Sequence, residues 1–259
     1  MTAEPVDPKT EILAEEFRRI SSESDRRGLA LRLFGSVGFY VHAREPGLYG
    51  QLGRDRINDL DFIGRAEERG EYKQLFGDLG YDADQDMLVA GEGRRFLYVL
   101  AHDRSIEVDL FIDRLEMCHT IELRDRVSLA SGTLPLVDLL LEKLQIVELN
   151  RKDMVDVVVL LAEHDLGPGA GAVDAGHAAR ILGDDWGFYY TATENIGRIR
   201  EFAAGARLDA AARSAVQRRL DALAREIEAA PKTRRWKLRA KIGTRKKWYQ
   251  EVEDGLAAF

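Results

Sequence analysis

The hydropathy pattern of the chain changes character at Pro135. Before this residue, short apolar runs with period-two alternation are mixed with amphipathic stretches and Gly-rich turns, a mixture typical of strands and helices together. After it, apolar residues recur only at helical spacing. The sequence therefore predicts an α+β fold, with a small mixed β-sheet core flanked by helices and an all-helical C-terminal half.

We expect three parts along the 259 residues. Residues 1–130 form the α+β core, residues 131–231 a helical region, and residues 232–259 a basic C-terminal segment. The Gly- and Pro-rich stretch 167–171 is the best candidate for a boundary within the helical half. With 45% apolar composition the chain is long enough to bury a substantial core.

Local patterns predict the individual elements. Asp7 and Pro8 mark the start of a first helix that ends near Gly28. The predicted strands cover residues 29–34, 60–63, 87–90, 95–101 and 105–112, the third and fourth of them forming a hairpin. The predicted helices cover residues 37–41 onward, 66–79, 135–149, 153–164, 173–182, 186–203 and 208–229.

The chain shows no signal for export or membrane insertion. Residues 1–7 lack a basic region followed by an apolar one, unlike a secretory signal peptide. The most apolar stretch, 134–149, carries four charged residues, which interrupts the run that a spanning helix needs. We expect a soluble cytoplasmic protein without membrane contact.

Charge is distributed unevenly. The net charge is −7, yet nine Lys and Arg residues lie between Lys232 and Lys247 with no acidic residue among them. Without these nine the remainder carries about −16. Two interpretations stay open: with Trp236 and Trp248 the segment binds a polyanion, or it packs as a helix against the acidic body.

Acidic residues alternate with apolar ones in two predicted strands. Because successive side chains of a strand point to opposite faces, Asp59 and Asp61 project to one side and Leu60 to the other. The same alternation places Asp109 on one face of strand 105–112. If these strands are neighbours, three carboxylates face one groove, a donor set suited to two divalent cations about 4 Å apart.

A strand-to-helix junction precedes these acids. Gly35 lacks a side chain that would obstruct a ligand, Ser36 supplies a hydroxyl, and the helix that follows presents free amides to phosphate groups. A triphosphate bound there would lie beside cations held by the carboxylates. The chemistry favoured by this combination is metal-assisted phosphoryl or nucleotidyl transfer.

In order and context, Gly35-Ser36, Asp59-Leu60-Asp61 and Asp109 resemble motifs of the polymerase-β-like nucleotidyltransferase superfamily. The resemblance covers roughly residues 28–113. It implies that the Gly-Ser pair binds triphosphate and that the three acids are catalytic ligands of Mg²⁺ or Mn²⁺. Ser36 and Asp59 are 23 positions apart, which an inserted loop at 45–56 explains.

The helical half adds a second likeness. Lys143, Arg151, Asp153 and Asp156 are similar in pattern to the AbiEii-like branch of that superfamily, which includes toxins of bacterial toxin–antitoxin systems. The likeness implies nucleotide or phosphate contacts for Lys143 and Arg151, a catalytic role for Asp153, and a cognate antitoxin as partner. Near a helix start, such carboxylates also stabilise the helix without any catalytic role.

The resulting hypothesis is an enzyme that transfers NMP from an NTP, such as ATP, to an acceptor and releases pyrophosphate. The basic segment favours RNA or tRNA as acceptor, whereas the acidic body would suit an aminoglycoside-like cation, and a protein acceptor is also open. Two other classes remain: a non-catalytic binding or regulatory protein that retains the fold, and a metal-dependent glycosyltransferase, which leaves Gly35, Ser36 and Asp109 without roles.

Overall fold

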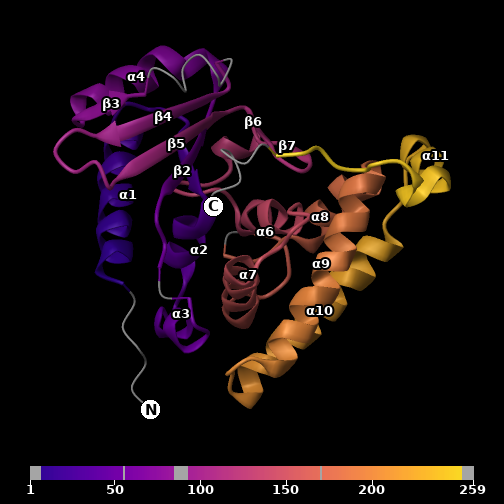
Figure 1. Cartoon of the computed structure of the whole chain (residues 1–259). Helices are drawn as coiled ribbons and strands as arrows, with labels where there is room; N and C mark the ends of the chain where they lie inside the picture. The colour runs from indigo at the N-terminus through magenta and orange to yellow at the C-terminus, as the bar shows by residue number, and fades with distance from the viewer. Residues whose placement is uncertain (1–6, 55, 85–92, 170, 253–259) are drawn as a thin grey trace.

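The computed structural model describes residues 7–54, 56–84, 93–169 and 171–252. Its architecture is α+β, as predicted: a twisted sheet with helices against it, followed by a helical half that extends to one side (Figure 1). The helices are α1 (Pro8–Arg26), α2 (Gly35–His42), α3 (Gly47–Gln51), α4 (Arg69–Asp78), α6 (Leu136–Leu144), α7 (Arg151–Glu163), α8 (Ala175–Asp184), α9 (Trp186–Gly205), α10 (Ala210–Ala229) and α11 (Arg234–Ile242).

The main sheet has five strands in the order β1-β2-β5-β4-β3. Strands β2 and β5 run parallel in its centre, and the other neighbours are antiparallel. A separate hairpin, β6–β7, follows β5 in the chain. The strands are β1 (Arg32–Phe34), β2 (Leu60–Gly64), β3 (Tyr81–Ala83), β4 (Arg95–Leu100), β5 (Glu107–Ile112), β6 (Arg114–Glu116) and β7 (Thr120–Glu122).

The central strands are buried on both faces. Every residue of β2 is buried, and so are all residues of β5 after Glu107. Helices α1, α2 and α4 pack around this part of the molecule, and α6 contacts α2. One hydrophobic core therefore runs from the sheet into the helical half, from Leu13 to Ile227.

The first helix illustrates how the sequence sets a boundary. The Asp7 side chain accepts a hydrogen bond from the Lys9 amide, and Pro8 occupies the first helical position, where its missing N–H costs nothing. The helix ends at Arg26, before Gly28 at φ +71°. The predicted start and stop are both confirmed.

The predicted strand 87–90 lies outside the described residues, so its hairpin with residues 95–101 stays a prediction. In the structure β4 pairs with β3, a strand that was not predicted. The helix predicted over 135–149 ends at Leu144, and Asn150 caps a separate helix that starts at Arg151. The hairpin β6–β7 was also missed, since each strand has only three residues.

The two longest helices of the helical half, α9 and α10, have 20 residues each and pack against each other. Helix α10 contacts α7, α8 and α9, and α11 lies at the far end of α9 (Figure 1). Asp174, Asp185 and Asp209 cap α8, α9 and α10 by accepting hydrogen bonds from amides in the first turn. Among the described helices, none is long and apolar enough to cross a membrane.

Candidate functional site

The parallel pair β2 and β5 brings two of the predicted acids together. In the strand register Asp61 is the direct partner of Asp109, so both side chains lie on the same face of the sheet. Both residues are buried, with 4% and 9% of their surface exposed. Asp59 precedes β2 and is half-buried. We call Asp59, Asp61 and Asp109 the carboxylate trio.

Gly35 lies directly against the trio. It follows β1, whose last residue pairs with Asp61, and it adopts φ +67°. A Cβ atom placed on Gly35 would lie 2.0 Å from Asp61 Oδ2, so any other residue here would clash with the carboxylate. Glycine is therefore required both for the turn into α2 and for the approach to Asp61.

A small cavity of about 50 Å³ opens beside these residues. Two of the trio line it, together with the Gly-Ser turn, one end of α6 and the hairpin β6–β7. The lining residues are Phe34, Gly35, Ser36, Asp59, Asp61, Phe111, Leu115, Met117, Glu142, Lys143, Gln145 and Ile146. The cavity holds one or two water-sized groups, which suits a cation or phosphate oxygens and not a whole nucleotide.

Burial disfavours the negatively charged forms of Asp59 and Asp61. Burial raises the pKa of Asp61 well above its ordinary value, and the neighbouring carboxylates of Asp59 and Asp109 raise it further. Burial is also the main cause of the raised pKa of Asp59. Asp61 Oδ1 is buried without a hydrogen-bond partner among the described residues. A cation beside these oxygens would relieve both the repulsion and the missing hydrogen bond.

Asp109, in contrast, already has a cationic partner. Arg95 of β4 donates to both carboxylate oxygens, at 2.8 and 2.9 Å, and its guanidinium lies over the ring of Phe111. Within the described part of the chain, no three His, Cys, Asp or Glu side chains are arranged to hold a metal ion. The side chains of Asp59 and Asp61 thus suit a divalent cation. Asp109 can bind the same cation only after its contact with Arg95 breaks.

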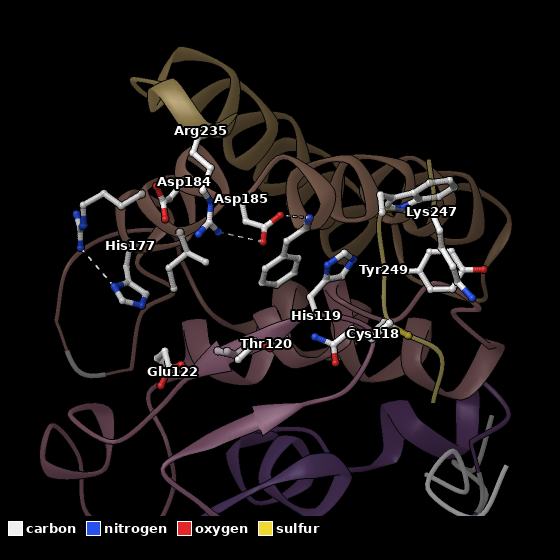
Figure 2. A pocket seen from close by; sticks show the side chains of 16 residues that line it. Cys118, His119, Thr120, Glu122, His177, Asp184, Asp185, Arg235, Lys247 and Tyr249 are labelled. Atoms are coloured by element: carbon white, nitrogen blue, oxygen red, sulfur yellow. Dashed lines mark hydrogen bonds and ion pairs between the residues drawn. The ribbon is translucent and has the colours of Figure 1, made fainter. Parts of the chain in front are cut away.

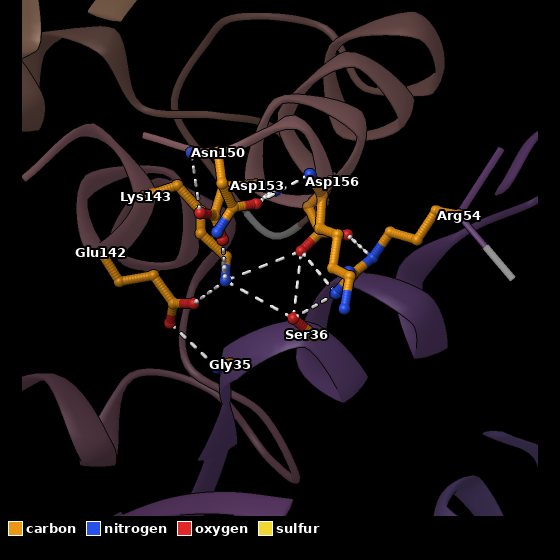
Figure 3. Close-up of polar contacts among 9 residues, drawn as sticks. Gly35, Ser36, Arg54, Glu142, Lys143, Asn150, Asp153 and Asp156 are labelled. Carbon is orange, nitrogen blue, oxygen red and sulfur yellow. Dashed lines mark hydrogen bonds and ion pairs between the residues drawn. The ribbon is translucent and has the colours of Figure 1, made fainter. Parts of the chain in front are cut away.

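Behind the Gly-Ser turn lies a second group of charges (Figure 3). Arg54 Nε forms an ion pair with Asp156 Oδ1 at 2.6 Å, and Arg54 Nη2 donates to Ser36 Oγ at 2.5 Å. The Ser36 hydroxyl donates in turn to Asp156 Oδ2, at 3.1 Å. We call Ser36, Arg54, Lys143, Asp153 and Asp156 the ion network.

Lys143 connects the ion network to the cavity. Its ammonium lies 3.1 Å from Asp153 Oδ1, 3.6 Å from Asp156 Oδ2 and 3.5 Å from Ser36 Oγ (Figure 3). Burial by itself lowers the pKa of Lys143, but these carboxylates outweigh it and raise the pKa above the usual value. Lys143 is therefore a fixed positive charge in the cavity wall.

The other two residues suggested by the resemblance lie elsewhere. Asp153 is buried, accepts from the Asn150 amide in a capping box, and pairs with Lys143; it does not line the cavity. Arg151 donates to the Leu52 carbonyl and lies over the ring of Phe202, along a different hollow. The structure brings Gly35, Ser36, Lys143 and the trio together, and leaves Arg151 apart.

Three residues near the cavity were missed from the sequence. Glu142 accepts a hydrogen bond from the Gly35 amide at 2.9 Å, and burial raises its pKa to about 7. Arg54 lies in the Gly- and Arg-rich loop that separates Ser36 from Asp59, and this loop is the only sequence signal for it. Arg95 is an ordinary strand residue until the sheet places it opposite β5.

Comparisons with protein family models, with curated proteins and with solved structures found no match. The geometry of the cavity therefore carries the functional argument.

Proposed function

We propose that this chain is a metal-dependent nucleotidyltransferase that transfers NMP from an NTP to an acceptor and releases pyrophosphate. One observation carries the proposal: Asp61 and Asp109 are register partners in parallel strands, with the Gly35 turn against Asp61. Burial of like charges costs several kcal/mol unless cations compensate them. Arg95 compensates Asp109, whereas Asp61 Oδ1 has no hydrogen-bond partner among the described residues, which supports a role for Asp61 in ligand binding.

In this proposal each group has a defined task. Asp59 and Asp61 would hold Mg²⁺ or Mn²⁺, which when bound neutralises triphosphate oxygens. Lys143 contributes a fixed positive charge to the same phosphate groups. Glu142 holds the Gly35 amide and so fixes the turn. Because the cavity is small, only phosphate oxygens reach Asp61, and the nucleoside stays outside.

Transfer requires two bonds to change. The acceptor hydroxyl gives up its proton to solvent while its oxygen forms a bond to the α-phosphorus, and the bond from that phosphorus to the bridging oxygen of pyrophosphate breaks. The protein contributes mainly position and charge to this step. Asp153 acts through Lys143 in this scheme, as a positioning residue, because it is buried behind the ammonium.

RNA or tRNA is the acceptor we favour, because of the basic C-terminal segment. An aminoglycoside-like cation is the alternative that the acidic remainder supports. A role as the toxin of a toxin–antitoxin pair, with a cognate antitoxin as partner, follows only from the resemblance and stays a proposal.

The test compares the wild type with Asp61→Asn, which keeps the size of the side chain and removes its charge. Each protein is incubated with Mg²⁺ or Mn²⁺, each labelled NTP, and either total RNA or an aminoglycoside. Pyrophosphate release should fall at least about 100-fold in Asp61→Asn. The matched control is Asp82→Asn, an exposed aspartate on β3 of the same sheet, which should release pyrophosphate at the wild-type rate. Release that survives Asp61→Asn would overturn the proposal.

A non-catalytic binding protein is the second candidate, and the bidentate contact of Arg95 with Asp109 favours it. In such a protein Arg95 would be the permanent partner of Asp109, and the other two acids would hold no metal. A titration with Mn²⁺ distinguishes the two functions. The enzyme should gain thermal stability from metal held by Asp59 and Asp61, whereas a protein whose acids bind no metal should gain none.

A further inference from the structure

The C-terminal segment doubles back across the helical half. After α10 the chain forms α11 and then returns past the start of α9 to the hairpin β6–β7, as the yellow trace in Figure 1 shows. We call residues 232–250 the basic arm.

Aromatic and backbone contacts hold the basic arm in place. Trp248 Nε1 donates to Thr191 Oγ1 at 3.0 Å, and the Gln250 amide donates to the Cys118 carbonyl at 2.9 Å. The ring of Trp236 packs edge-on against Tyr189 with 5.1 Å between centroids. Two cations of the arm also lie over rings of the body, Arg239 over Trp186 and Lys232 over Tyr189. The arm thus packs on the body, as one sequence interpretation expected, but mainly through rings and backbone groups and with little pairing to acidic residues.

Most cations of the arm take no part in this packing. Arg235 pairs loosely with Asp185 at 3.7 Å, and Lys247 pairs with Glu251. Within the described ranges, the other exposed cations have no carboxylate at ion-pair distance: Arg234, Lys237, Lys241, Arg245 and Lys246. Helix α11 has no buried residue. The positive charge is therefore available to a partner.

A cleft of about 900 Å³ runs along the arm (Figure 2). The arm forms one wall with Trp248 and Tyr249, and β7 and the ends of α8 and α9 form the others. Arg180, Arg235 and Lys247 bring cations to it. The volume is ample for one or more nucleotides, in contrast to the small cavity at Asp61.

The cleft also contains acceptors for hydrogen bonds. Glu122, Asp184 and Asp185 also line it, and Asp184 and Asp185 lie beside Arg235 (Figure 2). Carboxylates repel phosphate groups but accept hydrogen bonds from ribose hydroxyls and base amino groups. A ligand that suits all of these walls has phosphates, aromatic bases and hydroxyl donors together.

The cleft and the small cavity share one wall. Leu115 and Met117, on the β6 side of the hairpin, line the cavity, whereas the residues from Cys118 to Glu122 line the cleft. The His119 amide donates to Gln145 Oε1, and Gln145 itself lines the cavity. A ligand lying in the cleft is thus separated from the Asp61 cavity by the hairpin β6–β7.

We propose that the basic arm and this cleft bind single-stranded RNA and lead its end to the Asp61 cavity as the acceptor; the second clause rests on the proposed function. Phosphates would lie on the exposed cations, and a base would stack on Tyr249. A membrane surface fits less well, because α11 is only nine residues long and exposes two large apolar side chains, Leu238 and Ile242.

Binding of a fluorescein-labelled oligouridylate, measured by anisotropy without NTP or metal, tests the RNA surface. The triple variant Lys241→Ala, Arg245→Ala, Lys246→Ala should bind about tenfold to 100-fold more weakly. Its slope of log affinity against log salt should shrink by about 2, the value for three lost contacts with a single strand. The control removes three exposed cations of the sheet half: Arg69→Ala, Lys73→Ala and Arg104→Ala.

A second variant separates stacking from charge. Tyr249→Ala should weaken binding about fivefold to 100-fold without changing the salt slope. Equal losses in the control triple, or unchanged binding in the arm triple, would overturn the RNA surface. So would an arm triple that loses binding to phosphatidylcholine vesicles containing phosphatidylserine while its RNA binding stays intact.

The two proposals fail in different ways. Asp61→Asn should bind oligouridylate as the wild type does, because no arm residue changes. Loss of the RNA surface with pyrophosphate release still dependent on Asp61 defeats only the present inference. RNA binding that depends on the arm, with pyrophosphate release that survives Asp61→Asn, defeats only the nucleotidyltransferase.

Discussion

The two buried charged groups on either side of the Gly-Ser turn are built in opposite ways. In the ion network, Arg54 and Lys143 face Asp153 and Asp156 at 2.6–3.6 Å, so each charge has a partner of opposite sign. In the carboxylate trio, burial and mutual repulsion raise the pKa of Asp61, and one of its oxygens has no hydrogen-bond partner among the described residues. Burial raises the pKa of Asp156 too, but Arg54 and Lys143 compensate its charge. Among the described residues no such ion pair compensates Asp59 or Asp61.

This difference indicates a structural role for the ion network and a ligand-binding role for the trio. The ion pairs and hydrogen bonds of the network fix the position of Ser36 and Lys143 at the cavity wall. An unsatisfied carboxylate costs free energy, and such a cost is typical of a place where a ligand supplies what is missing. Breaking the ion network should therefore destabilise the fold, whereas neutralising an acid of the trio should not.

The largest expected effect comes from breaking the network. Arg54→Met should lower the free energy of unfolding by about 3–5 kcal/mol, because it leaves the Asp156 charge buried without its main partner. Urea denaturation measures the change. Arg200→Met, at an exposed pair with Asp221, is the control and should cost about 1 kcal/mol or less. Equal losses in the free energy of unfolding for the two variants would mean that the ion network does not stabilise the Gly-Ser turn.

Glu142 lies between the two groups and gives a pH signature. Its pKa is raised from 4.5 to about 7 in the folded protein, so the folded state keeps a proton that the unfolded state loses between these values. This stabilisation is complete below pH 4.5 and is lost as the pH rises through about 7. Glu142→Gln removes the dependence, so its stability advantage over the wild type should grow by up to about 3 kcal/mol toward pH 8.

Thermal or urea unfolding of Glu142→Gln at several pH values measures this gap. Glu148→Gln, an exposed glutamate just after the same helix, is the matched control and should follow the wild-type pH curve. A stability difference between Glu142→Gln and the wild type that stays constant with pH would show that Glu142 is ionised in the folded protein. Glu142 would then resemble the paired charges of the ion network and not the acids of the trio.

Neutralising Asp61 in the trio should change the stability of the fold in the opposite direction to breaking the ion network. Asp61→Asn should raise the stability of the metal-free protein by about 1–2 kcal/mol, because it removes a buried charge that repels its neighbours. Added Mn²⁺ should then stabilise the wild type and leave Asp61→Asn unchanged. A destabilised Asp61→Asn would place Asp61 among the structural residues.

How much of this could be predicted from the sequence depends on the range of each interaction. Alternation along a strand is local, so the shared face of Asp61 and Asp109 followed once the strands were taken as neighbours. The strand-to-helix junction at Gly35 was equally local. The partners of these groups were not: Arg54 meets Asp156 across 102 positions of the chain, and Arg95 meets Asp109 only because β4 pairs with β5.

Short secondary-structure elements also limited what could be predicted from the sequence. Strands β6 and β7 have three residues each, too few for a hydropathy period, and yet this hairpin forms the wall between the cavity and the cleft. The helix boundary at Asn150 needed knowledge of its capping box with Asp153, which puts a carboxylate expected in catalysis at a structural position.

The smallest expected effect concerns Arg151, and it sharpens the limits of the site. Its guanidinium is held by the Leu52 carbonyl at 2.8 Å and by the ring of Phe202, so it belongs neither to the trio nor to the ion network. Arg151→Ala should leave the KM for NTP within about twofold of the wild type. Lys143→Met, which removes the ammonium from the cavity wall, should lower kcat/KM by about 100-fold. Steady-state pyrophosphate release measures both. A large rise in KM for Arg151→Ala would extend the nucleotide site to the hollow beside α3. The site would then reach beyond the carboxylate trio and the ion network.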